Sequence, residues 1–507
     1  MDPDTRITSL PTLTVNALLR QAAEDYGDRA AIRYNEHGGV TDKSYRVFYR
    51  DSLAFAAYLG SRFPAPCHIA LLGKTTYAYL VCLNGIFLSG NTAVPLDAAL
   101  PKERLQYLLR DADAAGVFFD ETAKEAEAAF SGCPKLKHAM RLGAVAPETL
   151  PDGGTAAVKE SPEHCAAIFY TSGTTGKSKG VMLASAAIVS NVCFKEMALT
   201  GGHVALNVLP MHHIFSFSCD YLKNIKDGVT VCLSRGPAYL GEELQRYAPS
   251  VLRLVPMMAD SLFRKVRLQK KREPALSPRA AAERVFGRNI EKIIVSGASY
   301  WSDEEAAFIA MGITVRQGYG MTETGPRIAV PDGNTCMASG GRVISICRVR
   351  LQEGEIQVKS PSLMSGYYKQ PEETAKAFTP DGWFRTGDLG RLTPDNELFI
   401  TGRRKDLIIL ANGENVSPEE VELSYADEPL VAEIEVFENN GKIAALIRPD
   451  LTYAGKHGIT NVKAAIQQRI EIKNAADIAA REIDEFYLTE TPLARTATGK
   501  LIRRNRK

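Results

Sequence analysis

The segment at residues 170–180, Tyr-Thr-Ser-Gly-Thr-Thr-Gly-Lys-Ser-Lys-Gly, places hydroxyls, glycines and lysines between two apolar runs. The apolar residues 166–170 predict a strand, the short run at 180–183 predicts a second strand, and helical spacing begins only near Ser185. The pattern therefore predicts a strand–loop–strand hairpin. Glycines let backbone N–H groups approach an anion, hydroxyls add neutral donors and lysines supply positive charge. The loop is therefore suited to a polyphosphate.

The common P-loop does not fit this segment. Its pattern, G-x-x-x-x-G-K-[ST], would end at residues 176–178 and would need a glycine where Thr171 stands. A P-loop also leads into a helix whose N-terminus holds the phosphate, whereas a short apolar run follows here. For the loop considered alone, an ordinary Gly/Ser/Thr-rich turn stays an alternative.

Four more polar segments follow along the chain. They read Gln-Gly-Tyr-Gly-Met-Thr-Glu-Thr at residues 317–324, Gly-Trp-Phe-Arg-Thr-Gly-Asp-Leu-Gly at 382–390, Thr-Gly-Arg-Arg-Lys-Asp at 401–406 and Thr-Ala-Thr-Gly-Lys at 496–500. Taken singly, each has a plainer explanation as a glycine-rich turn, a turn aspartate, a solvated basic turn or a terminal tail. Ser417, Pro418 and Glu420 are typical of a helix start with a capping box.

With these five segments in this order, the chain resembles the adenylate-forming superfamily of acyl-CoA synthetases, luciferases and peptide-synthetase adenylation domains. The resemblance extends from Tyr170 to Lys500, as in a complete member. It implies ATP-dependent activation of a carboxylic acid, fatty or aryl, to acyl-AMP, followed by transfer to a thiol. Coenzyme A is the first choice of thiol, and the phosphopantetheine of an acyl carrier protein is the alternative. A non-catalytic nucleotide-binding sensor or scaffold is an alternative of another class. The implied cofactors are ATP/AMP, Mg²⁺ and coenzyme A.

The resemblance also assigns roles to single residues. The phosphate loop would contain Thr171, Ser172, Gly173, Thr174, Thr175, Gly176, Lys177 and Lys179. The adenine segments would contain Ser296, Gly297, Ala298, Gln317, Gly318, Tyr319, Gly320 and Met321, with Tyr319 stacked on the base. Thr322 would hydrogen-bond the α-phosphate, and Glu323 would hold Mg²⁺, a hard cation that prefers oxygen ligands.

Further roles fall in the last third of the chain. Asp388 would accept hydrogen bonds from the two ribose hydroxyls, and Arg403 would contact the ribose. Lys405 would be the hinge of a small C-terminal domain, and Gly413 would join the thiol tunnel. Lys500 would bridge the acid's carboxylate and the α-phosphate, where its ammonium offsets the charge that builds during attack.

The acid site is predicted around residues 209–217, Leu-Pro-Met-His-His-Ile-Phe-Ser-Phe. Amino-acid-activating members usually carry an aspartate in this neighbourhood, whereas this chain has His213 and Phe215, which resembles acyl and aryl acid enzymes. His213 would orient the carboxylate or gate the thiol channel, and a neutral core histidine is the alternative. The predicted catalytic residues are therefore Lys500, His213, Thr322 and Glu323.

Two neighbouring segments bear on the shape of the acid pocket. Residues 296–301, Ser-Gly-Ala-Ser-Tyr-Trp, depart from the family's Ser-Gly-Gly-Ala-Pro-Leu. Within the departure Ser299-Tyr300-Trp301, the bulk of Tyr300 and Trp301 would either shorten the pocket or point away from it. Residues 255–258, Val-Pro-Met-Met, would suit an alkyl chain, since methionine adapts to varied shapes, or would be plain core.

Segments of helical period alternate with short β-branched runs, as at residues 52–59 before 68–72 and 78–88 before 93–96. This alternation predicts α/β layers. The resemblance implies a large N-terminal domain at residues 1–404, made of two layered α/β subdomains and a small β subdomain. It implies a small mobile C-terminal α/β domain at residues 405–507. Residues 269–284, rich in Lys, Arg, Pro and Ala, predict an exposed excursion or mobile loop.

Composition agrees with a large soluble enzyme. A chain of 507 residues is longer than one core normally organises, and its net charge of +2 gives no sign of nucleic-acid binding. Nine scattered cysteines without a Cys-x-x-Cys pair, and no N-terminal leader, predict a cytoplasmic, reducing setting. The longest apolar run, 77–88, is too short to span a bilayer, and the sequence leaves the oligomeric state open. The basic end is expected to be solvated, with contact to coenzyme A phosphates as the alternative; it comprises Arg503, Arg504, Arg506 and Lys507.

Overall fold

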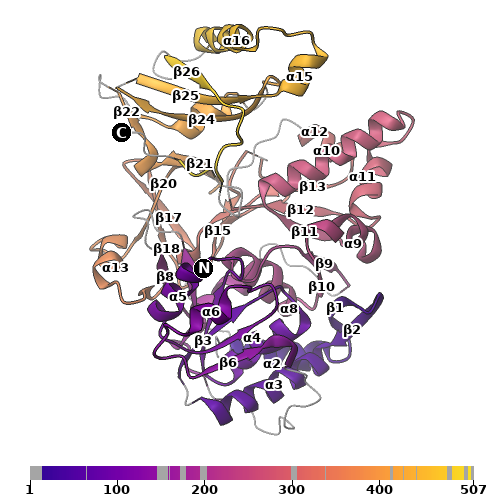
Figure 1. The fold of residues 1–507 in the computed structure, drawn as a ribbon, viewed down its shortest axis with the longest axis vertical. Helices are drawn as coiled ribbons and strands as arrows, with labels where there is room; N and C mark the ends of the chain where they lie inside the picture. Colours follow the sequence, from indigo (N-terminus) through magenta and orange to yellow (C-terminus); the bar gives the residue numbers. More distant parts are fainter. Residues whose placement is uncertain are drawn as a thin grey trace.

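The fold combines two large sheets, a group of small β-sheets and a C-terminal α/β unit (Figure 1). A computed structural model describes residues 14–63, 66–144, 158, 160–171, 178–194, 202–297, 305–336, 338–410, 415–425, 428–440, 442–476, 482–495 and 501–503. Ser172 to Lys177, Ala298 to Trp301, Gly413 and Lys500, which carry several of the predictions, lie outside these residues.

The first large sheet, sheet I, contains the predicted hairpin. Its order is β19 (Gly366–Tyr367), β8 (Lys179–Ala184), β7 (Cys165–Thr171), β4 (Thr92–Leu96), β3 (His68–Leu72), β5 (Ala114–Phe119), β6 (His138–Arg141). Strands β7 and β8 are antiparallel with Tyr170 opposite Gly180, and β8 leads into α7, which begins at Ser185. The strand–loop–strand prediction is therefore confirmed.

The second large sheet, sheet II, is also mostly parallel. Its order is β13 (Thr314–Gln317), β12 (Lys292–Val295), β11 (Val251–Leu254), β9 (Val204–Asn207), β10 (Thr230–Leu233), β1 (Ala30–Glu36), β2 (Gly39–Ser44). Only the β1–β2 pair at one edge is antiparallel. A parallel sheet needs helices on both faces, which accounts for the alternation of helical and apolar segments in the sequence.

One apolar core joins the inner faces of both sheets through a shared group of helices. These are α2 (Val15–Tyr26), α3 (Tyr45–Arg62), α4 (Tyr77–Leu88), α7 (Ser185–Val192), the π-helix η3 (Phe215–Leu222) and α8 (Lys223–Lys226). Helix α4 is apolar on all sides and correspondingly buried, as expected for a helix between two layers. In the described residues, no helix is long and apolar enough to cross a membrane, so the long apolar run is core.

Other helices cover the outer faces. Sheet I packs on α5 (Lys102–Asp111) and α6 (Ala126–Phe130), with a short 3₁₀ turn η1 (Leu142–Ala144) after β6. Sheet II packs on the turn η4 (Pro237–Tyr239) followed by α9 (Leu240–Tyr247), and on α10 (Pro256–Arg272), α11 (Pro278–Phe286) and α12 (Glu305–Ala310). All nine cysteines lie in the described residues as free thiols.

Residues 269–284 are largely exposed, as predicted, but the expectation that they form a loop is wrong. The end of α10 and most of α11 occupy this region, joined by a short turn. Ser277 caps α11 by accepting a hydrogen bond from the Ala280 N–H at 3.1 Å, and Pro278 takes the first helical position. Ala282 and Phe286 are fully buried against sheet II, so the basic composition belongs only to the outer face of the helix pair.

The small β-sheets connect the large sheets to the C-terminal unit. One sheet contains β14 (Tyr319–Gly320), β15 (Arg327–Val330) and β16 (Arg342–Val343), and the other contains β17 (Arg348–Gln352), β18 (Glu355–Lys359), β20 (Phe384–Leu392) and β21 (Leu398–Arg403). Helix α13 (Pro371–Ala377) precedes β20, and the 3₁₀ turns η5 (Thr322–Thr324) and η6 (Arg404–Asp406) follow β14 and β21.

The C-terminal unit lies at one end of the molecule, beyond β20 and β21 (Figure 1). It has its own apolar core and consists of β22 (Ile408–Ile409), β23 (Asn415–Val416), α14 (Pro418–Leu423), β24 (Val431–Asn439), β25 (Lys442–Pro449), α15 (Leu451–Lys456), α16 (Val462–Ala476) and β26 (Glu485–Leu488). The Ser417 side chain caps α14 through the Glu420 N–H at 3.4 Å, as predicted. The α/β fold with two layered units, a small β unit and a small C-terminal unit is confirmed; the boundary at residue 405 stays a prediction.

Candidate active site

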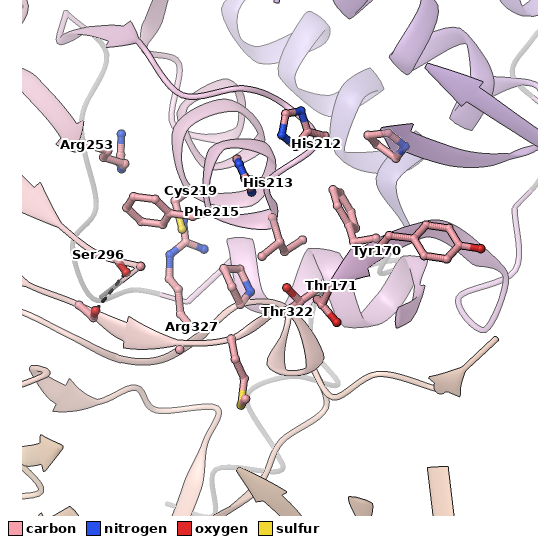
Figure 2. Close-up of a pocket in the computed structure, with 18 of the residues that line it drawn as sticks. Tyr170, Thr171, His212, His213, Phe215, Cys219, Arg253, Ser296, Thr322 and Arg327 are labelled. Carbon is pink, nitrogen blue, oxygen red and sulfur yellow. Dashed lines mark hydrogen bonds between the residues drawn. The ribbon is translucent and has the colours of Figure 1, made fainter. Parts of the chain in front are cut away.

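A cavity of about 470 Å³ lies where sheet I, sheet II and the β14–β15 sheet meet. Its wall includes the ends of β4 and β7 from sheet I, the ends of β11 and β12 from sheet II, and the start of the π-helix. The carboxyl ends of parallel strands are the usual place for a ligand in such sheets. Figure 2 shows side chains from all three parts directed toward one space.

The cavity brings together many of the residues predicted from separate segments. It is lined by Thr171, His213, Ser296, Gly297, Gly318, Tyr319, Gly320, Met321 and Thr322. Of the predicted residues that the structure describes, those that do not line the cavity are Lys179, Gln317, Glu323, Asp388, Arg403 and Lys405. Of this second group, Glu323 adjoins the lining residue Thr322 in η5, and Asp388 contacts the lining residue Tyr319.

Tyr319, Asp388 and Arg403 form one connected cluster. The Tyr319 hydroxyl donates to Asp388 Oδ2 at 2.8 Å, and Arg403 Nε lies 3.0 Å from Asp388 Oδ1. Strands β20 and β21 place Asp388 directly opposite Arg403, and Asp388 is only 4% exposed. Because each carboxylate oxygen can accept more than one hydrogen bond, Asp388 retains acceptor capacity for a diol.

The two predicted adenine segments are tied together by hydrogen bonds. Ser296 Oγ donates to the Gly318 carbonyl at 3.1 Å (Figure 2), and the Gly318 N–H donates to the Val295 carbonyl at 3.1 Å. At Gly320 a Cβ atom would lie 1.9 Å from the Pro326 carbonyl oxygen, so no side chain fits there. The glycine therefore allows the close backbone approach that folds the Tyr319 segment over the cavity.

Glu323 is a buried carboxylate beside the cavity. Its Oε1 accepts a hydrogen bond from the Tyr367 hydroxyl at 2.9 Å. Burial raises the pKa of Glu323, and the Tyr367 hydrogen bond partly offsets this. In the described part of the chain, no three His, Cys, Asp or Glu side chains gather to hold a metal by themselves. One such carboxylate fits Mg²⁺, which commonly takes one or two carboxylates and completes its shell with phosphate oxygens and water.

Lys179, at the end of the predicted phosphate loop, is held in an ion pair. Its Nζ lies 2.7 Å from Glu373 Oε2 in α13 and 4.7 Å from the centre of the Tyr367 ring. Glu373 and Tyr367 thus fix the first residue of β8 next to Glu323, which shares Tyr367 as a partner. The predicted phosphate loop and the predicted metal residue are therefore structurally linked.

His212 and His213 stand side by side just before the π-helix, with ring centres 4.3 Å apart. Burial, reinforced by the electrostatic effect of the neighbouring His213 imidazole, lowers the pKa of His212 to about 4, and Asp97 opposes this shift. Burial likewise lowers the pKa of His213, with Asp97 again opposing. Both imidazoles are therefore neutral near pH 7 and can donate or accept hydrogen bonds toward a ligand.

Of the two alternatives for residues 255–258, a surface for an alkyl chain or plain core, the structure favours core at Val255 and Met258. None of these four described residues lines the cavity. Val255 is buried at the start of α10, Met258 packs on the outer core of sheet II, and Met257 is 58% exposed. The turn from β11 into α10 carries this segment to the far face of the sheet, which the sequence alone did not indicate.

Sequence reasoning also missed the cations that line the cavity. Lys223, Arg253 and Arg327 all contribute to its wall. The available signal was a charged residue inside an apolar run, since Arg253 stands in Val-Leu-Arg-Leu-Val and Arg327 precedes Ile-Ala-Val. Such residues are rarely buried without a partner or a function.

The expectation that Arg503 is a solvated tail residue is wrong. Its side chain is 18% exposed and contacts Glu422 through both terminal nitrogens, at 2.6 and 2.7 Å. Arg504, Arg506 and Lys507 lie outside the described residues. Lys405 is an exposed residue of η6, between the last strand of the small β-sheets and the first strand of the C-terminal unit.

Comparison with known families decides the affiliation. A sequence model described as "AMP-binding enzyme" matches residues 19–368, and a second, "AMP-binding enzyme C-terminal domain", matches residues 405–506. The chain belongs to the AMP-binding enzyme family. The first match contains the phosphate-loop and Tyr319 segments, and the second contains Lys500.

This AMP-binding enzyme has relatives of two kinds. It is 26% identical over 388 residues to a 2-succinylbenzoate–CoA ligase of Bacillus cytotoxicus, and the matched region covers 73% of this chain and 74% of that ligase. It is 25% identical over 517 residues to a long-chain-fatty-acid–CoA ligase of Rattus norvegicus, with 87% and 71% covered. The fold matches that of the anthranilate CoA ligase AuaEII in complex with anthranoyl-AMP at a TM-score of 0.83, 18% identity and coverage of 98% and 97%.

Proposed function

We propose that this AMP-binding enzyme is an AMP-forming acid–thiol ligase that converts a carboxylic acid and coenzyme A into an acyl-CoA thioester. The observation that carries the proposal is the convergence of Thr171, Tyr319 and Thr322 on one cavity, with Asp388 and Arg403 held against Tyr319. These residues come from segments far apart in the chain, and their convergence on one cavity supports the roles proposed for them. The named coenzyme A ligases among its relatives support the choice of thiol.

In the first half-reaction, a carboxylate oxygen of the acid attacks the α-phosphorus of ATP. The new O–P bond forms acyl-AMP, the bond from the α-phosphorus to the bridging oxygen breaks, and pyrophosphate leaves. Tyr319 would stack on adenine, Asp388 and Arg403 would hold the ribose, and Thr322 would hydrogen-bond the α-phosphate. Thr174, Thr175 and Lys177 would hold the departing phosphates. The neutral His213 imidazole would orient the attacking carboxylate.

Charge stabilisation would come from two directions. Lys500 would place its ammonium between the carboxylate and the α-phosphate, where negative charge develops. Glu323 would hold Mg²⁺, which would supply Lewis-acid stabilisation of the phosphate oxygens. Glu323 is buried beside the cavity, and burial raises the pKa of its carboxyl. This position supports the role, because a nearby divalent cation would favour the ionised carboxylate.

In the second half-reaction, the sulfur of the thiol attacks the acyl carbon. The C–S bond forms, the C–O bond to AMP breaks, and the thiol proton is released. Sulfur would need the space proposed for Lys500 during adenylation, so the C-terminal unit, residues 405–507, would rotate about Lys405 and bring Gly413 to the thiol tunnel. The position of η6 between the small β-sheets and the C-terminal unit supports this division.

Exchange of labelled pyrophosphate into ATP tests the first half-reaction without assuming the acceptor. The panel includes fatty, aryl, dicarboxylic and amino acids, and we expect exchange that depends on at least one carboxylic acid. The same acid then yields AMP and a thioester with free coenzyme A, compared with a phosphopantetheine-bearing acyl carrier protein. Absence of exchange with every acid, with nucleotide binding intact, would instead support the non-catalytic sensor.

A further inference from the structure

Positive side chains gather on one wall of the cavity. This wall, here called the cationic wall, consists of Lys223 at the start of α8, Arg253 on β11 and Arg327 on β15. Their residues are 2%, 4% and 8% exposed, respectively. Figure 2 shows Arg253 and Arg327 on the side of Phe215 and Cys219, while Tyr170 and Thr171 lie toward the other side. The cationic wall is therefore separate from the phosphate-loop end of the cavity.

Two of the three cations have a buried carboxylate partner. Arg253 Nη1 lies 3.1 Å from Asp220 Oδ1, and Lys223 Nζ lies 2.6 Å from Asp227 Oδ2. Asp227 is also shared with Lys226 at 3.1 Å. These carboxylates pair with Arg253 and Lys223, whereas Asp227 acts on Arg327 only through its longer-range electrostatic field and forms no ion pair with it.

Arg327 is held by neutral acceptors. Its Nη1 donates to the Asn191 carbonyl at 2.7 Å and to Asn191 Oδ1 at 3.2 Å, and its Nη2 donates to the Ser218 carbonyl at 3.3 Å. Its guanidinium lies 5.2 Å from the centre of the Phe194 ring and also contacts the Cys219 thiol. Among the described residues, no carboxylate forms an ion pair with Arg327. Burial lowers the pKa of Arg327, but the group is charged at any physiological pH.

Among the described residues that line the cavity, no carboxylate pairs with Arg327. Among the described lining residues, Asp97 is the only carboxylate, and it acts on His212 and His213. Arg104 is another lining cation, and it donates to Ser178 at the edge of the phosphate loop. The cavity thus has excess positive charge at both ends. ATP would supply negative charge at the phosphate-loop end, and the acid substrate is the remaining ligand for the cationic wall.

A buried, uncompensated cation is costly unless a bound anion pairs with it. An alkyl tail lying against Arg327 would remove water from the guanidinium and give it no acceptor. A second anionic group on the substrate would give the Arg327 guanidinium a hydrogen-bond acceptor. A guanidinium and a carboxylate are both planar and can form two parallel hydrogen bonds.

We propose that the acid activated by this enzyme is a dicarboxylic acid whose second carboxylate pairs with Arg327 at the cationic wall. The inference rests on the proposed function, since it assumes that the cavity holds the acid beside ATP. The reacting carboxylate lies toward Thr322 and His213, and the distal carboxylate lies toward Arg327. Phe215 and Phe194, which also line the cavity, supply apolar surface for the carbon skeleton between the two charged ends.

The test compares each of a series of linear and aryl dicarboxylic acids with its own monomethyl ester in ATP–pyrophosphate exchange. The ester keeps one carboxylate for the reaction and nearly the same shape, but it lacks the second charge. For at least one pair we expect kcat/KM of the diacid to exceed that of the ester by roughly 30-fold or more, as for a buried charge pair that loses one partner. Equal or better use of esters or of fatty acids would overturn the inference while leaving the proposed function intact; absence of exchange with any acid would remove both.

Variants test whether the preference for the diacid over its ester depends on Arg327. In Arg327→Gln the ratio of diacid to ester should fall to near one, while exchange with the ester persists. An equal loss for diacid and ester would indicate a purely structural role and overturn the assignment. Arg110→Gln, the same change at an exposed position on α5 away from the cavity, is the matched control and should keep the full ratio.

Because Arg327 also braces Asn191 and Ser218, a second variant leaves it in place. Cys219→Asp puts a carboxylate beside the guanidinium, and we expect it to reduce use of the diacid selectively. Selective loss in this variant supports the pairing, whereas an unchanged diacid-to-ester ratio contradicts it. Circular dichroism and thermal unfolding check that each variant is folded. If either variant fails to fold, the comparison of diacid and monomethyl ester with the wild-type enzyme still decides the substrate class.

Discussion

Arg503 and Glu422 form a two-pronged ion pair, with Nη1–Oε1 and Nη2–Oε2 distances of 2.6 and 2.7 Å. Arg503 also donates to the Val436 carbonyl at 3.1 Å, which ties the end of the chain to both α14 and β24. In sequence, Arg503 follows Lys500 by three positions. The pair therefore anchors the segment just beyond the predicted catalytic lysine to the body of the C-terminal unit.

Replacing Arg503 with Gln should impair adenylation more than a general loss of stability would explain. Glu422 would keep its largely buried charge with the Val436 N–H but without its cationic partner, which lowers the free energy of unfolding by up to about 3 kcal/mol. We expect at least a tenfold loss in pyrophosphate exchange, roughly the effect of misplacing one catalytic group. Arg469→Gln breaks a comparable pair with Glu428, 2.9 Å apart in the same unit but away from the chain end. Equal losses in the two variants would argue against an anchoring role.

Lys500→Ala should separate the two half-reactions. Loss of the ammonium at the developing charge should slow adenylation by about a hundredfold or more. Reaction of preformed acyl-AMP with coenzyme A should change far less, because Lys500 is proposed to leave the site before that step. Single-turnover assays of each half-reaction measure the two effects, and equal loss in both would refute this division of labour.

Asp388→Asn should weaken ATP binding. The substitution removes the negative charge that Tyr319 and Arg403 both contact, and hydrogen bonds to charged groups contribute about 1.5–3 kcal/mol. We expect KM for ATP to rise about tenfold or more, measured at saturating acid. Asp381→Asn serves as the control, because that residue pairs with Arg350 at 2.7 Å on an exposed part of the small β-sheets. A similar rise in the control would point to a general effect on these sheets.

Stability should fall as the pH is lowered through the range set by His212. Its pKa is lowered from 6.5 to about 4 on folding, so between these values the unfolded chain binds more protons than the folded one. The contribution is complete above pH 6.5 and is lost as the pH falls toward 4, by up to about 3 kcal/mol. Denaturant unfolding of His212→Gln should show a shallower decline than wild type. His457→Gln, at an exposed position, should follow the wild-type curve.

Local patterns predicted the elements that depend on neighbouring residues. The hairpin around residues 170–180 and the capped start of α14 both follow from short-range rules, because strand alternation and helix capping involve residues close in sequence. The same kind of signal was present but overlooked at Ser277 and Pro278, where a capped helix was interpreted as a loop. There the basic residues of the exposed face obscured the apolar face that packs on sheet II.

The sequence by itself determined the family and the residue types available for chemistry, because glycine-rich turns, capping residues and polar motifs are specified locally. Only the tertiary structure decided which groups share the cavity. Lys223, Arg253 and Arg327 belong to separate elements, and nothing in their spacing indicates that they form one wall. Their convergence follows from sheet order and helix packing, which bring distant residues together through burial. Charge pairing is likewise a property of three-dimensional neighbours, so the lack of a described carboxylate paired with Arg327 becomes visible only in the folded chain.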